Sequence, residues 1–151
     1  MVDHLWEARL PGIQIVIDTN VLIAALRSPY GASYRVLSLL GAGHFDVHVS
    51  VPLVLEYESV ALRHLDDLPI TRNDVEDVLD FICQVSIAHE IYYVWRPFLS
   101  DPDDDMVLEV AVTGSCQAIV TFNKQDFRGC ERFGLRLLTP AELLQEIGVS
   151  R

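Results

Sequence analysis

The sequence feature that most constrains the fold is the stretch GIQIVID at residues 12–18, in which an apolar run ends on an aspartate. Ile15, Val16 and Ile17 follow one another without a polar residue between them, which is typical of a strand buried on both faces. The helical pattern NVLIAALRS begins two residues after Asp18. A buried strand leading at once to a helix favours a parallel sheet, in which Asp18 lies at the carboxyl end of the first strand.

The rest of the chain continues this alternation of strands and helices. Helical patterns are expected at 32–43, 52–65, 71–86, 101–116 and 139–148, and strands at 44–51, 90–95, 117–122 and 135–139. Right-handed crossovers place helices on both faces of such a sheet, so the pattern predicts an α/β fold, a three-layer α/β/α sandwich with a mostly parallel central sheet. We find no repeat or linker and expect residues 1–151 to form a single domain.

Composition narrows the class of protein. Half of the 151 residues are hydrophobic and mean hydropathy is +0.26, so the chain can bury a substantial core. No apolar run reaches the roughly 20 residues that span a bilayer, and the N-terminus does not resemble a secretory signal, so we expect a cytoplasmic protein without membrane contact. The net charge of −11 argues against a protein that grips nucleic acid through a basic face. It is compatible with an enzyme whose acidic pocket binds cations, or with a basic partner.

Oxygen-bearing side chains are concentrated near strand ends and helix starts. They come from four separate segments: Asp18; Glu56; Asp101, Asp103, Asp104 and Asp105; and Asn123 with Asp126. Because an open α/β sheet gathers the carboxyl ends of its strands at one edge, these side chains are expected to meet there.

Each segment also has a purely structural interpretation. Asp18 could cap the following helix, Glu56 could pair with Arg63, and Asp126 could cap a turn. Acids in the first turn of a helix are stabilised by ~0.3–1 kcal/mol each, which accounts for one or two of those in DPDDD. Four acids within five residues repel one another unless a cation lies among them. Their convergence favours a hard cation such as Mg²⁺, which needs only one or two carboxylates and could assist phosphodiester hydrolysis.

Several stretches, in this order, resemble the PIN domain family. They are IVIDTNVLIAAL (15–26), SVPLVLEY (50–57), DPDDDMVLEVA (101–111), AIVTFNKQDF (118–127) and LRLLTPAELL (135–144). The resemblance covers a core of about residues 13–147, and within the family the chain is similar to the toxin–antitoxin subgroup related to VapC-type toxins. It implies an α/β/α sandwich with a parallel sheet and the activity of an Mg²⁺- or Mn²⁺-dependent endoribonuclease.

Carried over position by position, the resemblance implies a role for each acid. Asp18, Glu56 and Asp104 match the catalytic, metal-binding acids, with Asp105 as the nearest rival of Asp104 and Asp126 as a further candidate ligand. The supporting residues would be Thr19, Asn20, Asp101 and Asn123. Thr19 and Asn20 match the small polar residues that orient the first acid.

Position 123 departs from the family pattern. Many relatives carry an aspartate two residues after the strand-end threonine, where this chain has Asn123. Asparagine still offers a neutral oxygen, but the site loses one charge, which would weaken a second metal ion. Basic residues are sparse. Arg27, Lys124 and Arg128 could contact RNA phosphates, although surface charges that offset an acidic chain are the commoner role.

The leading hypothesis is a metal-dependent endoribonuclease that hydrolyses RNA as the toxin of a toxin–antitoxin pair. The alternative is a catalytically weak or silent PIN-like binding module. A haloacid-dehalogenase-like phosphatase is disfavoured because its second acid would stand where this chain has Asn20. The resemblance also implies an antitoxin partner and a homodimer, for which the apolar helices VLIAAL (21–26) and YRVLSLL (34–40) are candidate faces.

Overall fold

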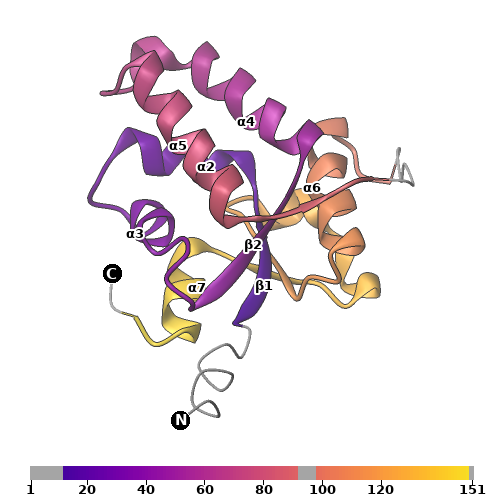
Figure 1. The fold of residues 1–151 in the computed structure, drawn as a ribbon. Coiled ribbons are helices and arrows are strands. Elements are labelled where there is room, and N and C mark those ends of the chain that lie inside the picture. Colours follow the sequence, from indigo (N-terminus) through magenta and orange to yellow (C-terminus); the bar gives the residue numbers. More distant parts are fainter. Residues whose placement is uncertain (1–11, 92–97, 150–151) are drawn as a thin grey trace.

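The structure is a computed structural model that describes residues 12–91 and 98–149. A five-stranded parallel sheet lies at its centre, in the order β3-β2-β1-β4-β5 (Figure 1). The strands are β1 (Ile13–Ile17), β2 (Phe45–Ser50), β3 (Ile87–His89), β4 (Ala118–Val120) and β5 (Arg136–Leu138). The helices are α2 (Thr19–Arg27), α3 (Ala32–Ser38), α4 (Val51–Arg63), α5 (Arg72–Val85), α6 (Pro102–Thr113) and α7 (Pro140–Glu146), with short 3-10 turns η1 (Leu65–Asp67), η2 (Lys124–Phe127) and η3 (Cys130–Phe133). Within the described ranges, no helix is both long and apolar enough to cross a membrane.

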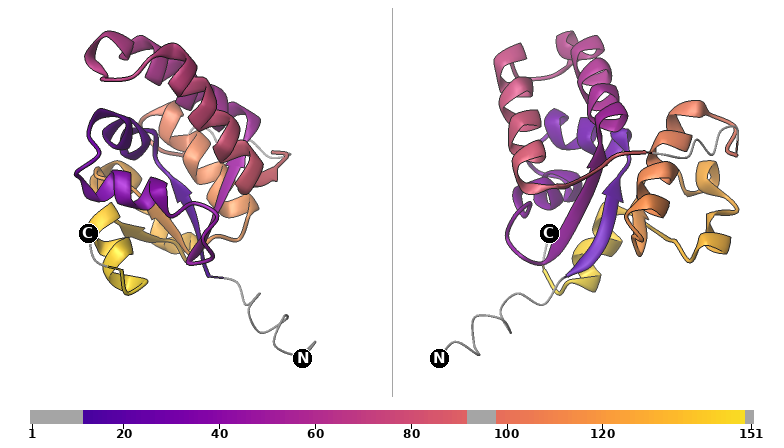
Figure 2. Two further views of the ribbon diagram at one scale, coloured as in Figure 1. Left: turned by 60° about the vertical axis from the view of Figure 1, so that its left-hand side comes forward. Right: turned by 45° about the vertical axis from the view of Figure 1, so that its right-hand side comes forward.

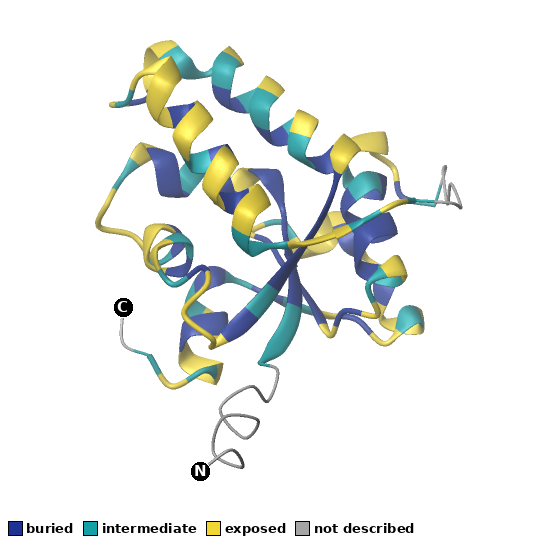
Figure 3. Ribbon diagram, in the orientation of Figure 1, coloured by how far each residue is buried: buried dark blue, intermediate teal, exposed yellow. Residues whose placement is uncertain are grey.

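Helices cover both faces of the sheet, which confirms the predicted α/β/α arrangement. α2, α3 and α5 lie on one face and α6 on the other, where it packs on β1, β2 and β4 (Figure 2). Buried residues run along the strands and the inner sides of these helices (Figure 3). Ile15 and Val16 have no exposed surface, because β1 has a strand on each side and a helix layer on each face. An unbroken apolar run is therefore the sequence expected of this central strand.

Local signals in the sequence set several helix starts. The Thr71 and Thr139 side chains each accept a hydrogen bond from the backbone N–H three residues on, and the Asp74 and Glu142 carboxylates each accept one from the backbone N–H of the cap residue. α5 and α7 thus begin with complete capping boxes. Ser50 caps α4 through its Oγ. These caps satisfy amides that have no partner within the helix.

One expectation lies mostly outside the described residues, and another needs correction. The strand expected at 90–95 lies mostly outside the described residues, and the strand that completes this edge of the sheet is β3, directly after α5. The helix VLIAAL is not a free face, because all six of its residues except Ala24 are buried. α2 packs against α3 and α4, so its apolar residues serve the core. On α3, Tyr34 remains exposed.

Candidate functional site

The acidic segments expected to converge do so at the carboxyl ends of the strands. Asp18 follows β1, Glu56 lies in the second turn of α4, and Asp101 begins α6. Two adjoining hollows, which we call the acidic cleft, open between these elements. The first is lined by Asp18, Thr19, Asn20, Glu56, Val60, Arg63, His64, Asp101, Asp103 and Asp104. The second is lined by Phe98, Leu99, Ser100, Asp101, Asp104, Gln125, Asp126 and Arg128. Asp101 and Asp104 belong to both and join them.

Asp18 is held at the end of β1 from the β4 side. Its backbone N–H donates to Val120 O at 2.9 Å, and Thr121 Oγ1 donates to its Oδ2 at 2.8 Å. Asp18 is the N-cap residue of α2, but its side chain makes no capping hydrogen bond to that helix, so capping does not account for the carboxylate. Burial raises the pKa of Asp18, the hydrogen bond from Thr121 opposes this, and the charges of Asp126 and Asp101 add to it.

Asp104 is the acid most perturbed by its neighbours. It is half-buried near the start of α6. Burial, followed by the charges of Asp18, Asp101, Asp126 and Asp103, raises its pKa to about 7. Carboxylates from three chain segments thus act on one another in the acidic cleft. Such repulsion is relieved when a cation lies among them, which makes the cleft a candidate functional site.

Glu56 and two arginines complete the cleft. Burial raises the pKa of Glu56, Asp103 raises it further, and Arg63 lowers it. Arg63 lines the first hollow and Arg128 the second. Each hollow therefore has an arginine beside the carboxylates, although the sequence had suggested Arg63 only as an ion-pair partner of Glu56.

The four acids of DPDDD separate into different environments. Asp101 accepts a hydrogen bond from the Asp103 amide at 2.9 Å and so caps α6 as well as lining the cleft. Asp105 is fully buried and lines neither hollow; its Oδ1 accepts from the Leu99 amide at 2.9 Å. Its Oδ2 has no hydrogen-bond partner within the described ranges. Asp105 thus anchors the segment before α6, while Asp104, turned by about 100° around the helix, lines the cleft.

Two of the predicted basic residues lie away from the cleft. Lys124 forms an ion pair with Glu142 at 2.7 Å, and Arg27 is exposed in the last turn of α2. Neither lines the acidic cleft. Of the three predicted phosphate contacts, only Arg128 lies in it.

Thr121 is the site residue that sequence reasoning missed. It is fully buried, donates to Asp18, and accepts a hydrogen bond from the Asn123 amide at 2.9 Å. Asn123 is half-buried and connects to the cleft through this bond. The available signal was the polar residue that ends the apolar run AIV, but its partner is 103 positions earlier.

The donor set of the cleft has the chemistry of a hard-cation site. Among the described residues, no three His, Cys, Asp or Glu side chains are grouped closely enough to form a metal site by themselves. Mg²⁺ requires only one or two carboxylates and keeps several waters. Asp18 and Asp104 supply such oxygens, and the raised pKa of each is consistent with a position that favours a bound cation. The residues present therefore fit a divalent cation whose coordination is completed by water.

Comparisons with known proteins agree with this fold. The family model for the PIN domain matches residues 14–125, which is more than half of the chain. No curated protein matches the sequence. A chain in the crystal structure of VapBC2 from Rickettsia felis, which is bound to a DNA fragment from the VapBC2 promoter, is similar in fold to this protein. The TM-score is 0.58 and the sequence identity is 13%. The similarity covers 83% of this chain and 98% of that one. On the strength of the family match, the chain belongs to the PIN domain family.

Proposed function

We propose that this protein is a metal-dependent endoribonuclease that acts as the toxin of a toxin–antitoxin pair. The observation that carries the proposal is the acidic cleft, in which Asp18, Glu56 and Asp104 come from three separate segments and each has a raised pKa. Membership of the PIN domain family supports nuclease chemistry at this place. The likeness to a VapBC2 chain supports a partner protein of the antitoxin type.

Each acid has a distinct role in this proposal. Asp18 and Asp104 bind Mg²⁺ or Mn²⁺, with Asp126 as a further ligand from the second hollow. A bound cation supplies an activated water and stabilises the leaving oxygen of the phosphodiester. Glu56 holds or orients that water, and Thr121 fixes the direction of the Asp18 carboxylate. Thr19, Asn20 and Asp101 support the first hollow, and Asp105 acts through the Leu99 segment rather than as a ligand.

The arginines suit an RNA strand that crosses the cleft. Arg63 lines one hollow and Arg128 the other, and in this proposal they bind phosphates on opposite sides of the cut bond. This would offset the repulsion between substrate phosphates and a chain of net charge −11. Lys124 is engaged with Glu142, and Arg27 contributes no contact at the cleft. We further propose that the chain forms one domain and acts in the cytoplasm as a homodimer.

The test is cleavage of single-stranded RNA by the purified protein with Mg²⁺, Mn²⁺ or EDTA. Asp18→Asn should abolish metal-dependent cleavage, and Asp80→Asn should not, because Asp80 is an exposed acid on α5 outside the cleft. The control removes the same charge without touching the site. Cleavage by Asp18→Asn at the wild-type rate would contradict the proposal.

A silent binding module is the second candidate. The observation in its favour is Asn123, which is neutral at a position where the resemblance to the PIN domain family implies an acid. A Mn²⁺ titration separates the two. A folded protein that binds no Mn²⁺ and cleaves no RNA is the module, whereas Mn²⁺ binding that is lost in Asp18→Asn supports the nuclease.

A further inference from the structure

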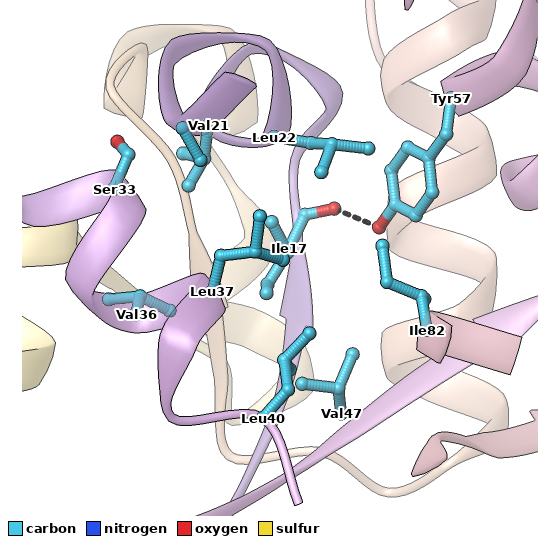
Figure 4. Close-up of a pocket in the computed structure, with 11 residues that line it drawn as sticks. Ile17, Val21, Leu22, Ser33, Val36, Leu37, Leu40, Val47, Tyr57 and Ile82 are labelled. Atoms are coloured by element: carbon cyan, nitrogen blue, oxygen red, sulfur yellow. Dashed lines mark hydrogen bonds between the residues drawn. The ribbon is translucent and has the colours of Figure 1, made fainter. Parts of the chain in front are cut away.

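Tyr57 connects the backbone positions beside two acids of the cleft. Its hydroxyl donates a hydrogen bond to the carbonyl oxygen of Ile17 (Figure 4). Ile17 directly precedes Asp18, and Tyr57 directly follows Glu56. A single hydrogen bond therefore ties the end of β1 to α4 at the positions adjacent to both carboxylates.

The peptide group between Ile17 and Asp18 is fixed from both sides by this arrangement. Its N–H donates to Val120 O at 2.9 Å, and its C=O accepts from Tyr57. The pairing of β1 with β4 continues to Ile17, whereas its pairing with β2 ends at Ile15. On the β2 side, the Tyr57 hydroxyl thus takes the place of a strand partner.

The surroundings of this hydrogen bond are apolar. Tyr57 is 1% exposed and forms one wall of a narrow pocket together with Ile17, Leu22 and Ile82 (Figure 4). A hydrogen bond is stronger electrostatically in such a medium than in water. A carbonyl left there without its donor would be costly, so the bond should be maintained whenever the protein is folded.

We propose that Tyr57 is a positioning residue of the acidic cleft. By fixing the Ile17–Asp18 peptide, it sets the direction of the Asp18 carboxylate relative to Thr121 and to Glu56. The inference rests on the proposed endoribonuclease function, and Tyr57 acts through Asp18 without touching the substrate. Misplacing a reacting group by about 1 Å can lower a rate about 100-fold, so a freed peptide should impair cleavage.

The test compares Tyr57→Phe with Ser50→Ala. The first removes only the hydroxyl that holds Ile17 O, and the second removes a buried hydroxyl that caps the same helix by accepting from the Leu53 amide. Four quantities are measured well below the melting temperature: kcat and KM for RNA cleavage, Mn²⁺ affinity, and the hydrogen-exchange rate of the Asp18 amide. Tyr57→Phe should lower kcat by about 10- to 100-fold with little change in KM, weaken Mn²⁺ binding, and speed exchange at Asp18. Ser50→Ala should lower Tm alone.

Each failure has its own signature. Unchanged kcat and Asp18 exchange in Tyr57→Phe, with a loss of Tm like that of Ser50→Ala, would show a merely structural hydroxyl and overturn the inference. If the wild type neither cleaves RNA nor binds Mn²⁺, the proposed function fails. Exchange at Asp18 then still decides whether Tyr57 fixes this peptide, because that measurement does not depend on activity.

Discussion

Two groups of polar residues on the same sheet are organised in opposite ways. In the acidic cleft, burial raises the pKa of Asp18, Glu56 and Asp104, and the charges of neighbouring aspartates raise each of these pKa values further. In the second group, which we call the histidine network, Gln14, Asp46, His48 and His89 form a chain of hydrogen bonds across β1, β2 and β3. His48 Nδ1 lies 2.6 Å from His89 Nε2, His48 Nε2 lies 2.7 Å from Gln14 Oε1, and Gln14 Nε2 donates to Asp46 Oδ2 at 2.8 Å.

The difference lies in where the partner of each polar group comes from. The Gln14 amide nitrogen donates to Asp46, so its oxygen accepts from His48 Nε2–H, which leaves His48 Nδ1 to accept from His89. Donors and acceptors alternate, and the network needs nothing from outside. The cleft has a surplus of acceptors, which only a cation, water or another donor can satisfy. Polar groups that satisfy one another indicate structure, and those that oppose one another indicate a site.

The largest expected effect follows from removing a charge from the cleft. Asp104→Asn should lower the cleavage rate by about 100-fold or more, because a charge aimed at the reacting centre is lost. In EDTA at pH 8 the variant should be more stable, because the repulsion between Asp104 and the neighbouring carboxylates is removed. The gain should be only about 1 kcal/mol, because solvent screens the charge of a half-buried carboxylate.

The pH dependence of that gain checks its cause. A carboxyl whose folded-state pKa is raised to about 7 destabilises the fold fully above pH 7, and this penalty shrinks as the pH falls and the carboxyl takes up a proton. Urea unfolding at pH 8 and pH 5 should therefore show a smaller difference at pH 5. A pH-independent difference would remove electrostatic repulsion as the explanation.

Thr121 gives one carboxylate of the cleft a hydrogen-bond donor from within the protein, as in the histidine network. Thr121→Val should lower activity about 10- to 100-fold, because Asp18 loses the donor that orients it and a metal would be held less firmly. Thr121→Ser keeps the hydroxyl and should retain most of the activity. Equal kcat values in the two variants would show that the hydroxyl does not matter.

Breaking the histidine network should cost stability and leave the chemistry alone. A Cβ at Gly114 would lie 2.6 Å from His48 Nδ1 and 2.9 Å from His89 Nε2. Gly114→Ala should therefore destabilise the protein by about 1–3 kcal/mol through overpacking. At Gly31, where a Cβ would meet nothing within 4 Å, the same change should cost less than about 1 kcal/mol. If the two variants unfolded at the same urea concentration, this account would be contradicted.

The smallest expected effect is the loss of stability that His48 causes at low pH. Burial lowers the pKa of His48, the charge of His89 lowers it further, and Asp46 opposes both. The folded state therefore takes up this proton at a lower pH than the unfolded state, so the histidine makes stability fall as the pH drops through 6.5. The slope is at most about 1.4 kcal/mol per pH unit. His48→Asn should flatten the curve between pH 7 and pH 5.5, and His44→Asn, at an exposed position, should not.

The parts of the molecule that could be predicted are those specified by local pattern. The run Ile15–Ile17 predicts the central strand, because a strand that is buried on both faces needs an unbroken series of apolar residues. β3 was not expected at 87–89, because two of its three residues, Ile87 and Ala88, are exposed and do not form a buried apolar run. Spacing alone does not separate Asp104 from Asp105, since only packing decides which of two adjacent helical residues faces the cleft.

Tertiary contacts account for the rest of what was missed. Thr121 acquires its role from Asp18, and Tyr57 acquires its role from Ile17. Each partner lies far away along the chain, so no local sequence pattern predicts either hydrogen bond. His48 depends on tertiary contacts in the same way, because it is buried and its hydrogen-bond partners lie on the neighbouring strands.

The separation of Asp18 and Thr121 along the chain bears on when the site first exists during synthesis. Asp18 is made early, but the threonine that orients it is made 103 residues later. At a translation rate of roughly 5–20 residues per second, several seconds pass before the two can meet. Pairing between such distant strands is also among the slower steps of folding. A nascent chain would therefore carry the first acid of the cleft before the residue that orients it, so the cleft cannot be complete until the chain has been made past β4.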